Sequence, residues 1–159
     1  MKEYHKKLNL KYASKTVHAP QWLDTYKEYY DYDTRVVKIL KLESDKIIME
    51  NLNGIILSNE QEMKKIDLKT LRYITNEVFD IWVNQWKFTT AHLKDDQIWI
   101  HNDFTIDNLM YVDGRVRLID PDSFVKKTIS KGILYSGNWR YGKFFETYIR
   151  LLSLIGMHK

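Results

Sequence analysis

The chain has 159 residues, 44% of them hydrophobic, which is enough to form one domain with a buried core. It contains no cysteine, which excludes disulfides and thiolate metal sites and fits a reducing cytoplasm. The net charge is +4, but the lysines are spread along the chain, and this argues against a nucleic-acid partner.

The N-terminal segment is charged and lacks the apolar core of a signal peptide. No apolar run in the sequence is long enough to cross a bilayer. We therefore expect a soluble, cytoplasmic protein without a membrane span.

The first predicted helix begins near Pro20, because proline is compatible with the first turn of a helix, and it runs to about residue 30. Its inward-facing residues are expected to be Trp22, Leu23, Tyr26 and Tyr30. Two strands should follow, over Arg35–Leu42 and Lys46–Glu50, and the segment Asn51–Gly54 should form a turn.

The longest predicted helix runs from Leu68 to about Leu93, with Asp67 as its N-cap and His92 placed favourably for the helix dipole. Apolar residues recur on it at intervals of three and four, as expected for one buried stripe: Leu71, Ile74, Val78, Ile81, Trp82 and Trp86. We interpret both tryptophans as core residues. A second amphipathic helix, from Tyr141 to about Leu154, is expected to pack against this one.

Between the two helices, short apolar runs alternate with polar residues. Runs at 98–100, 109–112 and 116–119 are typical of strands, and the Asp113-Gly114 pair predicts a hairpin turn between the last two. The segment 123–140 contains several basic and glycine residues and fits either a connector with glycine turns or part of a binding pocket.

Three oxygen-bearing side chains in this region lie at the ends of the predicted strands. Asp103 and Asn108 bracket a polar loop, and Asp120 follows the last apolar run, so the hairpin should bring them together. Phosphoryl transfer requires a group that orients the attacking hydroxyl and oxygen ligands for Mg²⁺, and these residue types could fill both roles. Taken singly, each acidic residue is more often structural, as in ordinary turn chemistry.

The order of these residues resembles a known catalytic core. The pattern is His101-x-Asp103, four intervening residues, Asn108, and an apolar strand that ends at Asp120. It is similar to protein-kinase-like small-molecule phosphotransferases, the group of aminoglycoside, choline and lipopolysaccharide-sugar kinases. The Asp120-Pro121-Asp122 ending also resembles this branch, because in protein kinases a Phe-Gly pair follows the aspartate.

The resemblance implies an α+β, protein-kinase-like fold with a reduced N-lobe and hinge over 1–54 and a mostly helical C-lobe over 55–159, together forming one compact unit. It implies ATP- and Mg²⁺-dependent transfer to a hydroxyl of a small molecule or sugar. Asp103 would be the catalytic base, and Asn108 and Asp120 the magnesium ligands. Asp122 would be a further ligand or a solvated turn residue. His101 would support the loop by tying backbone carbonyls together.

The nucleotide-binding part of the resemblance is incomplete. Glu50 and Leu52 would lie near the adenine edge, and either Lys11 or Lys15 would contact the phosphates. No glycine occurs before Gly54, so the family's Gly-rich loop is absent. Three interpretations follow: a minimal kinase whose phosphate site is completed by these lysines or by another subunit of a homo-oligomer, a kinase with slow and open chemistry, or a catalytically inactive pseudokinase that binds nucleotide or a protein partner.

In the same family, the segment after the metal-binding aspartate helps to form the acceptor pocket. Here Trp139 and Arg140 could stack on or clamp a sugar or a carboxylate. The alternative is that this segment is only a connector with glycine turns.

Overall fold

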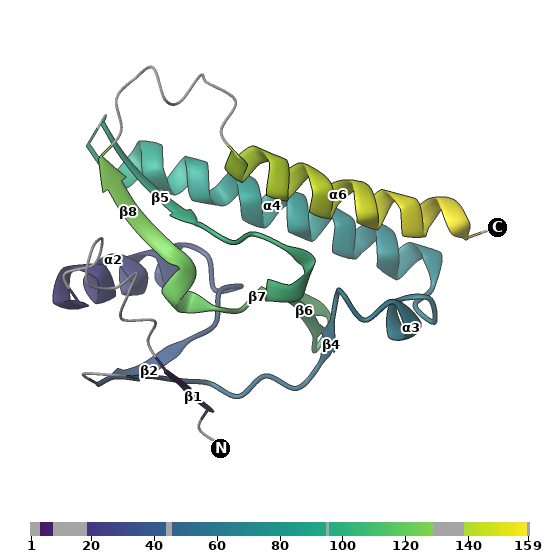
Figure 1. Cartoon of the computed structure of the whole chain (residues 1–159), viewed down its shortest axis with the longest axis horizontal. Helices are drawn as coiled ribbons and strands as arrows, with labels where there is room; N and C mark the ends of the chain where they lie inside the picture. Colours follow the sequence, from purple (N-terminus) through teal and green to yellow (C-terminus); the bar gives the residue numbers. More distant parts are fainter. Residues whose placement is uncertain (1–3, 8–18, 44–45, 95, 129–138, 159) are drawn as a thin grey trace.

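Figure 1 shows the computed structural model of the chain, which describes residues 4–7, 19–43, 46–94, 96–128 and 139–158. The fold is α+β, with small antiparallel sheets and several helices, as the sequence predicted. In chain order the elements are β1 Tyr4–Lys7, α2 Ala19–Tyr32, β2 Ile39–Leu42, β3 Lys46–Met49, β4 Ile55–Ile56, α3 Glu60–Met63, α4 Leu68–His92, β5 Gln97–His101, η1 Ile106–Asn108, β6 Leu109–Val112, β7 Arg115–Leu118, η2 Pro121–Ser123, β8 Phe124–Thr128 and α6 Trp139–Met157.

The strands of the described residues form three small sheets, with the orders β1-β3-β2, β4-β6-β7 and β5-β8. The predicted β6–β7 hairpin is confirmed, and its turn residues Asp113 and Gly114 have φ values of 50° and 76°. Positive φ at both central residues is the backbone of a tight hairpin turn, and the Asp-Gly pair favours it. The pairing of β5 with β8 was not predicted, because β8 occupies part of the segment expected to be a connector.

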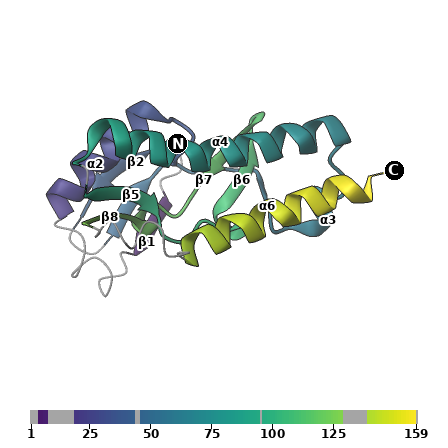
Figure 2. The ribbon, with the colours of Figure 1, turned by 90° about the horizontal axis from the view of Figure 1, so that it is seen from above.

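The helix predicted from Leu68 is confirmed as α4, and the Asp67 carboxylate accepts a hydrogen bond from the Thr70 backbone N–H at 2.9 Å. Its apolar stripe is buried, including Trp82, whereas Trp86 is partly buried against the core. The second predicted helix is confirmed as α6, which extends further at both ends than expected. Figures 1 and 2 show α6 lying along α4, and Phe144 of α6 stacks on Trp82 with ring centroids 4.9 Å apart.

Helix α2 covers the β5–β8 pair through aromatic residues. Trp22 and Tyr26 are buried as predicted, but Leu23 and Tyr30 are only half-buried, while Tyr29, which we did not assign to the inward face, is fully buried. The ring nitrogen of Trp22 donates to the carbonyl oxygen of residue 124 at 2.9 Å, which joins α2 to the start of β8.

The strand predicted over Arg35–Leu42 is divided in the structure. Residues 35–37 pair with the end of β7, where Val37 N–H donates to the Leu118 carbonyl at 2.9 Å and Leu118 N–H donates to the Arg35 carbonyl at 2.8 Å. Of this predicted strand, only the part Ile39–Leu42 pairs with β3. The buried Arg35 guanidinium holds residues 35–37 away from β3. It binds the carboxylate of Asp33, two residues earlier, and those of Glu77 and Asp80 on α4.

Gly54 lies at the end of the predicted turn, where the chain approaches the β6–β7 hairpin closely. A Cβ atom at this position would be 2.3 Å from the Tyr111 carbonyl oxygen and 2.6 Å from the Val112 Cβ. Only glycine can therefore bring β4 against β6 without displacing the backbone. Among the described residues we find no helix with the length and apolar character of a membrane-spanning segment.

Candidate functional site

The polar loop between β5 and β6 is bound at both ends to the segment that follows β7. At its start, Asn102 N–H donates to the Ser123 carbonyl at 2.8 Å, and at its end, the Asn108 carbonyl accepts from Ile119 N–H at 2.9 Å. The loop carries Asp103 and Asn108, and Asp120 directly follows Ile119. The structure therefore places all three predicted oxygen ligands on adjoining backbone segments.

His101, at the end of β5, connects the two segments a third time. Its Nε2 lies 3.2 Å from the Ile119 carbonyl oxygen and 3.0 Å from that of Asp120, while Asp103 N–H points at its Nδ1 from 3.3 Å. Because carbonyls only accept and an N–H only donates, we assign the neutral tautomer with its proton on Nε2. The ring ties backbone carbonyls together, the arrangement expected of it from the sequence.

Asp120 has a left-handed backbone conformation, with φ 69° and ψ 58°. This conformation is uncommon for a residue with a side chain, so the contacts around it must hold it in place. The His101 ring binds its carbonyl oxygen, Ser123 N–H donates to the same oxygen at 3.0 Å, and the Ser123 hydroxyl donates to Oδ2 of its carboxylate. Asp122 lies two residues further on, in η2, and is partly buried.

Asp103 is contacted from the loop and from α6. The Asn108 amide nitrogen donates to the Asp103 carbonyl at 2.9 Å and to Oδ2 at 3.1 Å. The ammonium of Lys143 lies 2.5 Å from Oδ1. Partial burial disfavours the ionised carboxylate, but the hydrogen bond and charge of Lys143 outweigh it, so the pKa of Asp103 is below its ordinary value.

The donor set fits a hard divalent cation. Since the Asn108 nitrogen donates to Asp103, its amide oxygen is the atom that could bind a metal, and Asp120 has a carboxylate on the adjoining segment. Magnesium prefers such oxygen ligands and retains several waters, so a few protein ligands suffice. Within the described ranges, no three His, Cys, Asp or Glu side chains are grouped as a metal site, so the asparagine is essential to this assignment.

The residues expected to contact nucleotide are less clearly placed. Glu50 is used within the fold: its N–H donates to the Lys38 carbonyl at 3.0 Å, and its carboxylate accepts from Lys38 N–H and from the guanidinium of Arg117. Leu52 is partly buried in the segment between β3 and β4. Lys11 and Lys15 lie outside the described residues.

Three residues at the site were not identified from sequence. Lys143 and Ser123 carried no distinctive signal, since each contacts the site only after the chain has folded. Gln85 could have been noticed, because it is a polar residue in the apolar stripe of α4. It is fully buried, and its side-chain oxygen accepts from His101 N–H at 2.7 Å, which fixes the end of β5 against α4.

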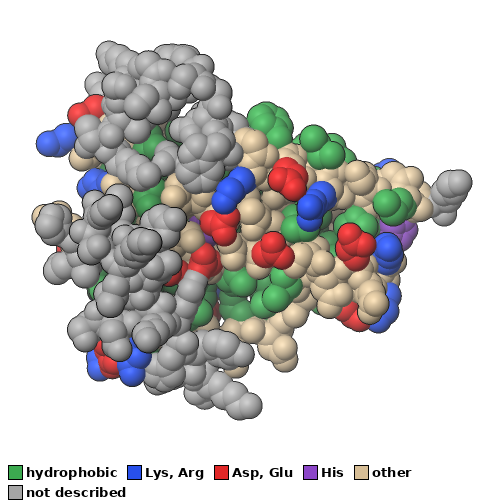
Figure 3. Space-filling model, viewed as in Figure 1, with side chains coloured by type: hydrophobic (Ala, Val, Ile, Leu, Met, Phe, Trp, Pro, Cys, Tyr) green, Lys and Arg blue, Asp and Glu red, His purple; other side chains and the backbone are tan. Residues whose placement is uncertain are grey.

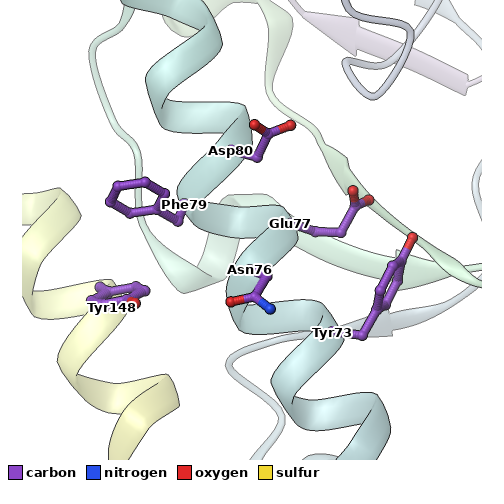
Figure 4. A pocket seen from close by; sticks show the side chains of 6 residues that line it. All are labelled: Tyr73, Asn76, Glu77, Phe79, Asp80 and Tyr148. Carbon is purple, nitrogen blue, oxygen red and sulfur yellow. The ribbon is translucent and has the colours of Figure 1, made fainter.

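A shallow cavity of about 480 Å³ lies elsewhere, along α4 (Figure 4). Five α4 residues and one α6 residue line it, none of them from the loop: Tyr73, Asn76, Glu77, Phe79, Asp80 and Tyr148. Its two carboxylates bind Arg35 and therefore belong to the ionic cluster that anchors residues 33–35 to α4. On the coloured part of the face in Figure 3, acidic and basic side chains are interspersed, which is unlike a nucleic-acid-binding patch.

No protein-family model matches the chain, and no curated protein sequence matches it. Among solved structures, the chain is similar to the ADP-bound crystal structure of aminoglycoside phosphotransferase APH(2'')-Ib, with a TM-score of 0.32. The sequence identity is 13%, and the comparison covers 87% of this chain and 77% of that one. The similarity is weak at this TM-score.

Proposed function

We propose that the chain is an ATP- and Mg²⁺-dependent phosphotransferase that acts on a hydroxyl of a small molecule or sugar. The observation that supports this most is the threefold connection between the loop and the segment after β7, made by Asn102, Asn108 and His101. It holds side by side the backbone segments that carry Asp103, Asn108 and Asp120, which come from separate parts of the sequence. Phosphoryl transfer needs little more than such positioning and charge stabilisation.

Asp103 is proposed to orient the acceptor hydroxyl and to take its proton. As the hydroxyl oxygen attacks the terminal phosphorus, the bond to the leaving ADP oxygen breaks, and the proton passes to the Asp103 carboxylate. A low pKa makes this aspartate a weak base, but it keeps the carboxylate ionised and able to accept a hydrogen bond from the hydroxyl. That suits a loose transition state, in which proton removal is late.

Asn108 and Asp120, with Asp122 as a further ligand, would hold Mg²⁺, which when bound neutralises charge on the phosphates. His101 is proposed to contribute indirectly, by fixing the backbone of Asp120 and the direction of the Asp103 N–H. Ser123 orients one carboxylate oxygen of Asp120, in the way that groups beside a metal ligand commonly do.

The adenine and phosphate contacts are proposed for residues 1–54, as a reduced N-lobe and hinge. Because the Glu50 amide and carboxylate are already bonded within the fold, the adenine edge would meet backbone groups near Leu52. Lys11 or Lys15, or a second subunit of a homo-oligomer, would contact the phosphates in place of a Gly-rich loop.

One observation favours a second function. The Lys143 ammonium already occupies Oδ1 of Asp103, as expected if the aspartate no longer handles a substrate hydroxyl. The alternative is therefore a catalytically inactive pseudokinase that serves as a nucleotide-binding or protein-interaction module.

A thermal-shift measurement tests the nucleotide site. ATP with Mg²⁺ should raise the unfolding temperature of the wild type, because a ligand that binds the folded state stabilises it. Asp120→Ala should abolish this shift, whereas Asp107→Ala, an exposed aspartate in the same loop region, should retain it. If ATP with Mg²⁺ does not shift the unfolding temperature of the wild type, both the phosphotransferase and the nucleotide-binding pseudokinase are refuted. Binding of ATP without turnover would favour the pseudokinase.

A further inference from the structure

The ion pair between Asp103 and Lys143 joins residues 40 positions apart in sequence and connects the loop to α6. The two side chains are 45% and 38% exposed, respectively. An ion pair with this degree of exposure contributes little to stability, because water screens the charges and two side chains must be ordered. Its position beside the reacting groups therefore calls for a different explanation from anchoring α6.

Helix α6 has other contacts that hold it to the loop. Phe144 stacks on Trp82 of α4 and lies 6.0 Å from the ring of Phe104, and the Thr147 hydroxyl donates to the Phe104 carbonyl at 3.4 Å. Lys143 and Thr147 are four positions apart and so share one face of the helix. These contacts fix the height and rotation of α6, and the base of the Lys143 side chain is thereby directed at the loop.

A cation supplied by the protein would support the proposed chemistry beside Mg²⁺. Asp103 and Asp120 are acidic residues on adjoining backbone segments, and a nucleotide would add the charge of its phosphates. Phosphoryl transfer depends on cations that stabilise charge on the transferred group. The loop from His101 to Asn108 contains no lysine or arginine, so a side-chain cation at this place has to come from another element.

We propose that Lys143 contacts the terminal phosphoryl group of ATP while remaining hydrogen-bonded to Asp103. This inference rests on the proposed phosphotransferase function and assigns to α6 a phosphate-contacting residue. The ammonium has three N–H donors on a flexible stem, so one can stay on Oδ1 while another reaches a phosphate oxygen beside the attacking hydroxyl. Under this proposal the ion pair is part of the active arrangement, whereas in the pseudokinase alternative it occupies the aspartate in place of a substrate.

The test compares Mg-ATP and Mg-ADP binding by calorimetry in the full chain, because ADP lacks the group that Lys143 is proposed to contact. Lys143→Met should weaken Mg-ATP binding by about tenfold or more, the size expected for one lost hydrogen bond between charged groups, and change Mg-ADP binding by less than about twofold. Lys143→Arg, which retains the charge, should recover most of the loss. The rate of ATP hydrolysis should decrease from the wild type to Lys143→Arg and further to Lys143→Met.

Arg150→Met is the matched control, since Arg150 is an exposed base on the same helix that pairs with Glu146. It should leave both nucleotide affinities unchanged. Equal losses for ATP and ADP in Lys143→Met, or no loss for either, would overturn the inference while leaving the proposed function in place. A wild type that binds neither nucleotide would overturn both. If Lys143→Met lowers the unfolding temperature, Lys143→Gln replaces it in the same comparison and is judged by the same outcomes.

Discussion

The His101 ring holds Asp120 by its backbone, with Nε2 3.0 Å from the Asp120 carbonyl oxygen across 19 residues of sequence. The same ring accepts the Asp103 N–H at Nδ1, so one imidazole fixes both aspartates relative to each other. Asp120 has a left-handed backbone there, and this conformation sets the direction in which its carboxylate leaves the chain. The His101 ring therefore holds the backbone of the Asp103 loop against that of Asp120.

Replacement of His101 by alanine should destabilise the protein. The change removes a buried ring, takes the His101 hydrogen bond from the carbonyls of Ile119 and Asp120, and leaves the Ser123 N–H still donating to the Asp120 carbonyl. We expect the free energy of unfolding to fall by about 2–4 kcal/mol, measured by urea denaturation. His92→Ala, at an exposed histidine on α4, should cost less than about 1 kcal/mol. Similar losses of unfolding free energy in the two variants would contradict the structural role of the His101 hydrogen bonds.

Replacement of Asp103 by asparagine should remove turnover while the fold is kept. The amide has nearly the same shape, but it cannot take the proton of the attacking hydroxyl. ATP hydrolysis, followed by phosphate release, should fall by about 100- to 10,000-fold. Asp107→Asn, at an exposed position in η1, should hydrolyse ATP at the wild-type rate. Circular dichroism should show the same unfolding temperature within a few degrees for both variants, and equal activity of the two would exclude Asp103 as the base.

Replacement of Gly54 by alanine should be strongly unfavourable for a reason of space. The new methyl group would be placed 2.3 Å from a backbone oxygen of β6, and backbone cannot move aside as a flexible side chain can. We expect a loss of about 2 kcal/mol or more in the free energy of unfolding. Gly142→Ala, where nothing lies within 4 Å of the added atom in α6, should instead be neutral or stabilising by up to about 1 kcal/mol. A tolerated Gly54→Ala would mean that β4 does not approach β6 so closely.

The buried ionic cluster predicts how stability depends on pH. Burial raises the pKa of Asp33, but hydrogen bonds from Arg35 and Asn84 outweigh it, so the pKa lies below its ordinary value. A carboxyl whose folded pKa is depressed stabilises the fold above its unfolded pKa, about 4, and this contribution is lost as pH falls through the folded value.

Asp33→Asn should therefore cost about 2–4 kcal/mol at about pH 7, because Arg35 loses a buried partner, and clearly less at about pH 3. Urea denaturation at both pH values gives the comparison. Glu43→Gln is the control, since Glu43 forms ion pairs with lysines at the surface and should change stability little at either pH. A cost of Asp33→Asn that does not depend on pH would contradict the assignment of a depressed pKa.

Much of the secondary structure was predictable because it depends on neighbours in sequence. The apolar stripe and the Asp67 cap determine α4, and the Asp113-Gly114 pair determines the β6–β7 hairpin. The same local signals failed where a distant partner competes for the backbone. From the sequence, residues 35–37 were predicted to begin the strand that contains β2. In the structure they pair with β7, because carboxylates on α4 hold the Arg35 guanidinium.

Some residues of the candidate site were likewise predictable from the sequence, and others were not. The residue types and their order are visible without a fold, because His101, Asp103, Asn108 and Asp120 are spaced between apolar runs. The contacts of Lys143 with Asp103 and of Gln85 with His101 exist only in the folded chain. Both contacts depend on how α4 and α6 pack, and helix packing is set by side-chain burial across the whole core, which no local pattern specifies.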